Sequence, residues 1–178
     1  KLVRFQDTFW ASIISVLIAM AIYNVLVYAM HPSTAYLWYL AFHILAFCYF
    51  SALNGFGNLF WPQSIQIWLA QNIMFFNFIL IFFVVNFANA FLEAKKNTPW
   101  HYKYILHFRI ITAVGALFSL IIAEYNMIPL FVIFQTLATV YGISMGVVAY
   151  KNGFTPAKYF LISWIFTLAG GAVGMATV

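Results

Sequence analysis

The 178-residue sequence is too apolar for a water-soluble protein. Only 6% of its residues are charged, 66% are hydrophobic and the mean hydropathy is +0.96. A soluble globular domain carries roughly a quarter charged residues, so the composition indicates an integral membrane protein with the lipid bilayer as its surroundings. The net charge of +5 does not indicate nucleic-acid binding, because the few basic residues lie in connections and form no continuous stripe.

Six apolar segments follow one another along the chain, each long enough to cross a hydrocarbon core of roughly 30 Å as a helix. They are uniformly apolar, whereas the strands of a membrane barrel alternate between apolar and polar residues. The sequence therefore predicts an all-α helical bundle in a single domain. Each of the five prolines falls in a connection, so we expect no proline to interrupt a span. The expected spans are residues 8–30, 34–53, 65–92, 104–123, 128–150 and 157–178.

Basic residues are unevenly divided between the two sides of such a bundle. Lys1 and Arg4 precede the first span, whereas five lysines occupy the third and fifth connections. Lys and Arg gather in cytoplasmic loops, so we expect the amino terminus on the side of the membrane that faces away from the cytoplasm. The last span ends without a flanking charge or aromatic anchor, and we expect a seventh helix beyond residue 178 in a longer chain.

Arg109 is the one formal charge well inside an expected span. Asn86, Asn89 and Glu93 have the i, i+3, i+7 spacing that places side chains on one face of the preceding helix. An intramembrane charge is costly unless it is paired or reaches the interface. We therefore predict an intramembrane polar cluster of Arg109 with these three residues. The alternative is that Arg109 extends to the headgroups alone.

No catalytic or metal-binding arrangement is visible. The only carboxylates are Asp7, Glu93 and Glu124, all near expected interfaces, and no phosphate-binding loop of the Walker type is present. His43 lies in the middle of the second span without a second histidine at that depth, so a hydrogen bond across the bundle is expected rather than a haem or metal. We expect no enzyme activity, cofactor or metal in this stretch.

Small residues recur four positions apart on several expected helices. In lipid there is little hydrophobic drive between helices, so close backbone approach matters. This spacing predicts tight packing within the bundle, and a homodimer interface is the alternative. The packing positions are Gly142, Gly146, Gly170 and Gly174.

Several short motifs resemble one known family along essentially the whole chain. They include Leu53-Asn-Gly55, Leu59-Phe-Trp-Pro62 and Gly153-Phe-Thr-Pro-Ala-Lys-Tyr-Phe160. The chain in these respects resembles the membrane region of bacterial seven-transmembrane receptors with diverse intracellular signalling modules. The resemblance implies seven helices in the bacterial cytoplasmic (inner) membrane and an extracytoplasmic amino terminus, often preceded by a sensory domain. It also implies a cytoplasmic output domain such as a histidine kinase or cyclic-dinucleotide enzyme.

We therefore expect a receptor module that relays an outside stimulus to a cytoplasmic signalling domain. The outer turn would contact the sensor domain through Asn54, Gly55, Trp61 and Pro62. The cytoplasmic segments would contact the output domain through Lys95, Lys96, Lys103, Lys151, Pro156, Lys158 and Tyr159.

Two other classes stay open. A transporter or channel subunit requires polar residues that converge at mid-depth, for which the sequence offers only His43, Asn77 and Gln135. A structural subunit of a larger membrane complex requires only docking surfaces at the two ends. Substrate flux in liposomes would favour the first class, and purification with native partners would test the second.

Overall fold

The computed structural model describes residues 2–53, 60–122 and 124–165, and the regular structure in these ranges is entirely helical. Two short helices lie in the charged turn between the third and fourth expected spans, and a further helical segment covers residues 157–165. The helices are α1 (Leu2–Met30), α2 (Thr34–Leu53), α3 (Gln63–Gln71), α4 (Ile73–Phe91), α5 (Ala94–Asn97), α6 (Pro99–Tyr102), α7 (Ile105–Ser119) and α8 (Glu124–Lys151).

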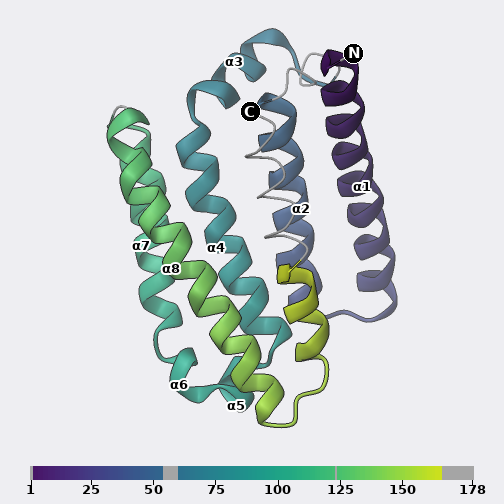
Figure 1. The fold of residues 1–178 in the computed structure, drawn as a ribbon, viewed down its shortest axis with the longest axis vertical. Coiled ribbons are helices and arrows are strands. Elements are labelled where there is room, and N and C mark those ends of the chain that lie inside the picture. Colours follow the sequence, from purple (N-terminus) through teal and green to yellow (C-terminus); the bar gives the residue numbers. More distant parts are fainter. Residues whose placement is uncertain (1, 54–59, 123, 166–178) are drawn as a thin grey trace.

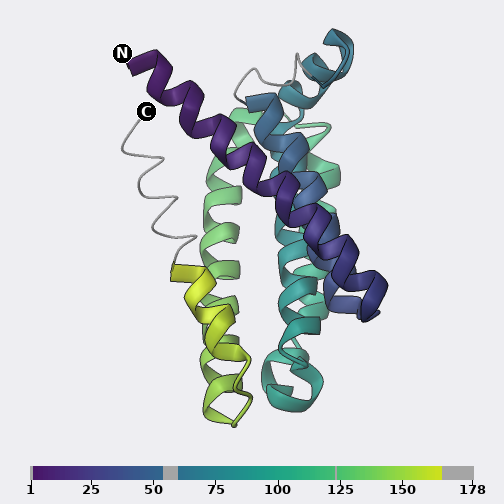
Figure 2. The ribbon, with the colours of Figure 1, turned by 90° about the vertical axis from the view of Figure 1, so that its right-hand side faces the viewer.

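Helix α4 is the centre of the bundle. It packs against α2, α7 and α8, whereas α1 packs against α2. Figure 1 shows these helices side by side, and Figure 2 shows α1 crossing the bundle at an angle. The 157–165 segment lies beside both α4 and α8: Phe160 stacks on Phe91 of α4 with ring centroids 6.1 Å apart, and Phe160 and Leu161 face Gly146 of α8. Because α4 is central, every one of its residues is buried or partly buried.

Four of the described helices are long and apolar enough to cross a membrane: α1, α2, α4 and α8. Helix α7 is apolar and packs along α4, but it has only 15 residues. The predicted all-helical membrane bundle is confirmed. The count of six spans with a seventh is not established by these helices.

The expected third span, residues 65–92, is wrong as one continuous helix. It is divided into α3 and α4 at Asn72, whose backbone has φ −115° and ψ 32°. The Asn72 side-chain amide donates to the carbonyl of Trp68 at 2.7 Å. Asn competes well for nearby backbone groups, and here its amide binds a carbonyl of the helix that ends.

The expected fourth and fifth spans have different boundaries in the structure. Helix α7 ends at Ser119, four residues early, and α8 begins at Glu124, four residues before the expected start. Pro129 consequently lies inside α8. The expectation that no proline falls within a helix is wrong here: Pro129 is the sixth residue of α8 and lacks the N–H that would bond the carbonyl four residues earlier.

The two largest clusters of buried side chains in the described residues hold the bundle together. One lies in the middle, where Phe78 is 1% exposed and contacts Gly115 of α7. The other lies at the end of the bundle near the charged turn and joins α4, α5, α7, α8 and the 157–165 segment. Its buried members are Ala88, Leu92, Ala94, Ile105, Met145, Ala149, Ala157 and Phe160.

Candidate functional site

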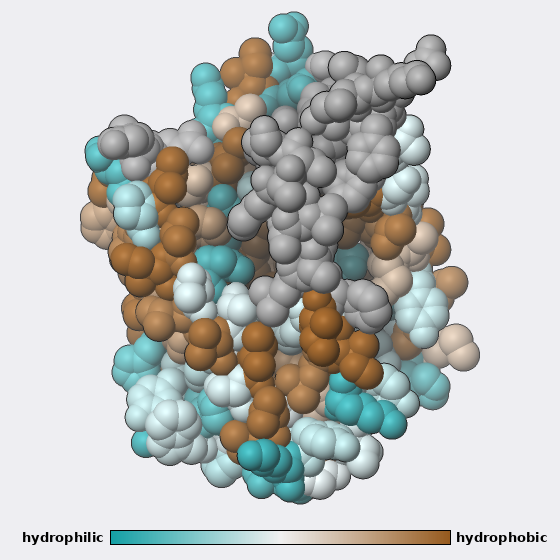
Figure 3. Space-filling model, in the orientation of Figure 1, coloured by the Kyte–Doolittle hydropathy of each residue, from teal (hydrophilic) through white to brown (hydrophobic). Residues whose placement is uncertain are grey.

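Five lysines predicted to share one side lie at the same end of the bundle. They belong to α5, the residue after α6, the end of α8 and the start of the 157–165 segment. We call this end, with residues 93–103 and 151–159, the basic end; it is the lower end in Figure 1. Figure 3 shows hydrophilic side chains there and apolar ones over the middle of the same face. The lysines are Lys95, Lys96, Lys103, Lys151 and Lys158.

The charged turn begins with an abrupt change of backbone direction. Leu92 is fully buried, and Glu93 has a left-handed backbone with φ 47°. Such a conformation costs roughly 1–3 kcal/mol in a residue other than glycine, so surrounding contacts must hold it. One of these is the Asn97 side-chain amide, which donates to the carbonyl of Leu92 at 2.8 Å. The turn is therefore a defined structure rather than a simple connection.

Hydrogen bonds fix the charged turn to α8 and the residue that follows it. The Asn152 amide donates to the backbone carbonyl of Asn97 at 2.7 Å, and the Tyr141 hydroxyl donates to the carbonyl of His101, also at 2.7 Å. The His101 ring contacts the hydroxyl of Ser144 through Nε2 at 3.1 Å. These bonds connect residues 40 to 55 positions apart, so a movement of α8 would be transmitted to the turn.

His101 is the buried centre of this network. The Ser144 hydroxyl donates to the carbonyl of Tyr141 at 2.8 Å, so it accepts the proton of His101 Nε2. His101 Nδ1 is then unprotonated, and it is buried without a hydrogen-bond partner among the described residues. Burial lowers the pKa of His101 below its usual value of 6.5, because a proton on Nδ1 would be neither solvated nor paired.

The structure divides the predicted intramembrane polar cluster. Since α4 ends at Phe91 and Glu93 turns away, Glu93 does not continue the stripe of Asn86 and Asn89. The Glu93 carboxylate is 55% exposed and lies 3.9 Å from the Lys96 ammonium. The Asn86 amide donates to the Phe82 carbonyl at 2.8 Å. Within the described ranges, Asn86 Oδ1 and Arg109 Nε are both buried without a hydrogen-bond partner.

Asn86 and Arg109 nevertheless lie at similar depth. Ala88 of α4 and Ile105 of α7 belong to the same buried cluster at the basic end. Counted from this shared level, Asn86 lies ~3 Å and Arg109 ~6 Å further into the bundle. The acceptor and donor without partners are thus on neighbouring helices, although no ion pair or hydrogen bond joins them in the part of the chain described.

At the opposite end, the outer turn is held by an aromatic anchor. Trp61 Nε1 donates to the buried hydroxyl of Ser51 at 3.1 Å, and its ring lies 6.2 Å from that of Phe47. Pro62 precedes α3 directly. Asn54 and Gly55, the other two residues predicted for this turn, lie outside the described residues.

The glycines of α8 lie against the 157–165 segment. A Cβ atom on Gly146 would come within 2.9 Å of both Phe160 and Leu161, and one on Gly142 within 3.2 Å of Trp164. These short distances are what the predicted close approach of helices requires. Gly170 and Gly174 lie outside the described residues.

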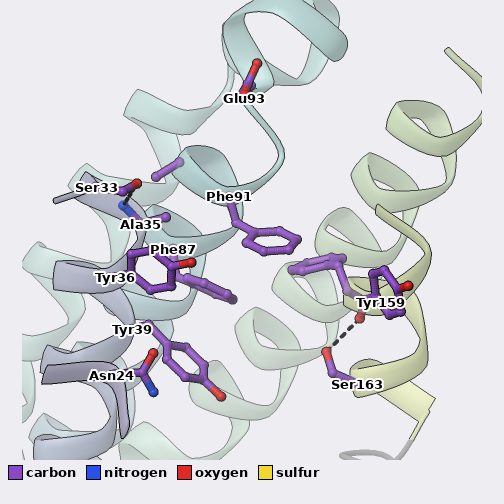
Figure 4. A pocket seen from close by; sticks show the side chains of 12 residues that line it. Asn24, Ser33, Ala35, Tyr36, Tyr39, Phe87, Phe91, Glu93, Tyr159 and Ser163 are labelled. Carbon is purple, nitrogen blue, oxygen red and sulfur yellow. Dashed lines mark hydrogen bonds between the residues drawn. The ribbon is translucent and has the colours of Figure 1, made fainter. Parts of the chain in front are cut away.

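A cavity of about 350 Å³ opens between α1, α2, α4 and the 157–165 segment (Figure 4). Asn24, Tyr36 and Tyr39 line one side, and Tyr159 and Ser163 line the other. Tyr159, predicted to contact the output domain, therefore also borders this cavity. Lys158, its neighbour, places its ammonium 4.8 Å from the centroid of the Tyr159 ring.

The polar residues that a transport pathway would need are dispersed. His43 donates through Nδ1 to the Tyr39 carbonyl at 2.9 Å, a bond within its own helix, and the expected bond across the bundle stays a prediction. Asn77 is buried in α4, whereas Gln135 is exposed on α8. Among the described residues, no group of three or more His, Cys, Asp or Glu side chains could hold a metal ion.

Sequence reasoning missed the network around His101. No role was predicted for His101, Ser144, Tyr141 or Asn152. One signal was present: Tyr141 and Ser144 are three residues apart on a largely apolar helix, a spacing that places both on one face. Nothing in the sequence indicated that this face meets the charged turn.

The comparisons with known proteins agree with the geometry. The model of the family described as 7TM diverse intracellular signalling matches residues 6–178, which covers almost the whole chain. No curated protein and no solved structure matches it. The earlier resemblance is thereby confirmed, and the apolar helices fit a transmembrane signalling protein. The chain belongs to the 7TM diverse intracellular signalling family.

Proposed function

We propose that this chain is the membrane relay of a receptor, which passes an extracytoplasmic stimulus to a cytoplasmic output domain. Its membership of a signalling family carries the proposal. The amino terminus is outside in this scheme, because the five lysines of the basic end then face the cytoplasm. Any catalytic activity belongs to a fused domain, and six spans with a seventh complete the bundle.

The relay works through two packings of the bundle with similar free energy. A stimulus that binds one packing more tightly shifts the population toward it. The basic end is suited to read such a shift, because Asn152 and Tyr141 bind the charged turn from the α8 side. The output domain then contacts the lysines, Pro156 and Tyr159, and the sensor domain contacts the outer turn near Trp61 and Pro62.

Arg109 is our candidate for the group that senses the change within the bundle. In the packing described here, its Nε and the Oδ1 of Asn86 are buried without partners. A small shift of α7 along α4 would allow the two atoms to pair, which would stabilise the second packing. Asn86→Ala and Arg109→Ala, alone and together, test this in a double-mutant cycle. Additive effects on stability and on signalling output would contradict the pairing.

Single cysteines test the orientation. Cys48 is first replaced by Ser, and Cys is then placed at Lys95 in the basic end or at Gln63 in α3. Both positions are exposed, and they lie at opposite ends of the bundle in Figure 1. A membrane-impermeant maleimide added to spheroplasts should label position 63 and not position 95 until the membrane is permeabilised. The reverse pattern would overturn the orientation.

Signalling itself is tested in the native reading frame with its own output domain. Asn152→Ala should change basal output activity, because it removes a bond between α8 and the charged turn. Gln135→Ala on an exposed face of α8 is the matched control and should leave the output unchanged. Equal output from both variants would contradict the relay. Substrate-dependent flux through reconstituted liposomes would favour a transporter instead.

A further inference from the structure

An apolar groove follows the junction of α7 and α8. These neighbouring helices contact each other much less than each contacts α4. Two cavities of about 340 and 270 Å³ lie along the junction, and Ile111 and Phe134 line both of them. The buried Phe134 and Phe78 form part of the floor. The two cavities are therefore sections of one groove, open toward the surroundings of the bundle.

The shape and chemistry of the groove match a hydrocarbon chain. In the section of the groove nearer the basic end, the exposed lining atoms are all apolar, and in the other section nearly all of them are apolar. Along α8 the lining extends from Tyr141 to Met127, a distance of ~21 Å. One leaflet is half of a hydrocarbon core of roughly 30 Å, so a groove of this length is long enough for the whole of one acyl chain. The rims are exposed, with Leu137 at 54% and Ile111 at 47%.

A positive charge is held at one end of this groove and not at the other. Trp100 and Tyr104 line the end of the groove, and the Lys103 ammonium lies 5.7 Å and 4.9 Å from the centroids of their rings. From residue 110 to residue 150 the sequence contains no Lys or Arg. A cation–π arrangement of this kind restrains the ammonium where a phosphate group would lie if an acyl chain occupied the groove.

We propose that the α7–α8 groove binds an anionic phospholipid. One acyl chain lies between Ile111 and Phe134, and the phosphate is bound by Lys103 at the rim of Trp100 and Tyr104. A basic residue near the membrane surface attracts anionic headgroups. The apolar groove adds contacts with an acyl chain, which a lipid has and free phosphate lacks. The lipid binds in the leaflet of the basic end, whichever side of the membrane that end faces.

Native mass spectrometry of the full chain in detergent tests the headgroup contact. Phosphatidylglycerol and phosphatidylcholine with identical acyl chains are titrated separately. We expect the anionic lipid to bind about fivefold more tightly, as one lysine contact near the surface allows. Lys103→Gln should abolish this preference and Lys103→Arg should restore it. Lys158→Gln is the matched control, because Lys158 also lies over a tyrosine ring, that of Tyr159, but outside the groove.

Filling the groove tests the acyl-chain contact. Leu137→Trp introduces a large side chain into the lining and should weaken binding of both lipids. Ile133→Trp is its control, because Ile133 is similarly exposed at 59% on the same helix but does not line the groove. Three results would each overturn the proposal. They are equal affinity of the native chain for both lipids, a loss of the anionic preference in Lys158→Gln as large as in Lys103→Gln, and unchanged lipid binding in Leu137→Trp. Loss of a dimer rather than of lipid in Leu137→Trp would identify the groove as an interface between copies.

Discussion

Replacing Gly115 by alanine should destabilise the bundle, although alanine is the better helix former. The added Cβ would lie 2.7 Å from two carbons of the Phe78 ring. That ring is 1% exposed and packs edge-on against Phe131, with ring centroids 5.8 Å apart. Higher helix propensity contributes about 1 kcal/mol in favour of alanine, whereas overpacking of a dense core costs about 1–3 kcal/mol. We expect a net loss of about 1 kcal/mol in the free energy of unfolding.

Phe78→Leu separates these two contributions. The smaller side chain makes room for the methyl group that the Gly115→Ala substitution adds, so in that background Gly115→Ala should be neutral or stabilising. Unfolding in mixed detergent and SDS micelles, followed by circular dichroism, gives the free energies of unfolding of the native chain, the two single variants and the double variant. A coupling energy of about 1 kcal/mol is expected for residues in direct contact. If Gly115→Ala costs the same in both backgrounds, the ring contact is not the cause and the reasoning fails.

Three further predictions concern the basic end. Burial lowers the pKa of His101 below 6.5, so just below pH 6.5 the unfolded chain binds more protons than the folded chain. The free energy of unfolding should therefore be constant above pH 6.5 and fall as the pH drops below it. The His101→Gln variant should lack this pH dependence. Asn152→Ala should cost about 1 kcal/mol and speed amide hydrogen exchange in residues 94–103, which Gln135→Ala should not. Gly153→Ala, at φ 89° with nothing within 4 Å of the added Cβ, should cost about 1–2 kcal/mol from backbone conformation alone, measured by the same unfolding assay.

The features predicted well from the sequence are those set by local composition. The second span was predicted at residues 34–53, and α2 has these boundaries. Continuous apolar runs and flanking prolines define such a helix without reference to its neighbours. The grouping of five lysines at one end was also predictable, because alternate connections of antiparallel helices must lie on the same side.

The features that were missed depend on contacts between distant residues or on single backbone angles. The break lies at the polar pair Gln71 and Asn72 within an apolar run, a pair that does not by itself fix the end of a helix, and in the structure the Asn72 amide binds the Trp68 carbonyl there. The left-handed backbone of Glu93 ended the expected polar stripe. Periodicity assumes a continuous helix, so one residue with positive φ is enough to move every later side chain to another face.

The position of that left-handed residue connects the fold to the proposed relay. Leu92 and Ala94, on either side of Glu93, are buried in the same cluster as Met145 and Ala149 of α8. A dense core transmits displacement because it does not compress, so α8 cannot slide along α4 without moving α5. The Glu93 side chain is exposed, whereas its backbone carbonyl accepts hydrogen bonds from the amides of Lys96 and Asn97, so a change in its backbone angles would rearrange the start of α5. A strained residue between two buried neighbours is therefore a suitable place for the basic end to switch between two arrangements.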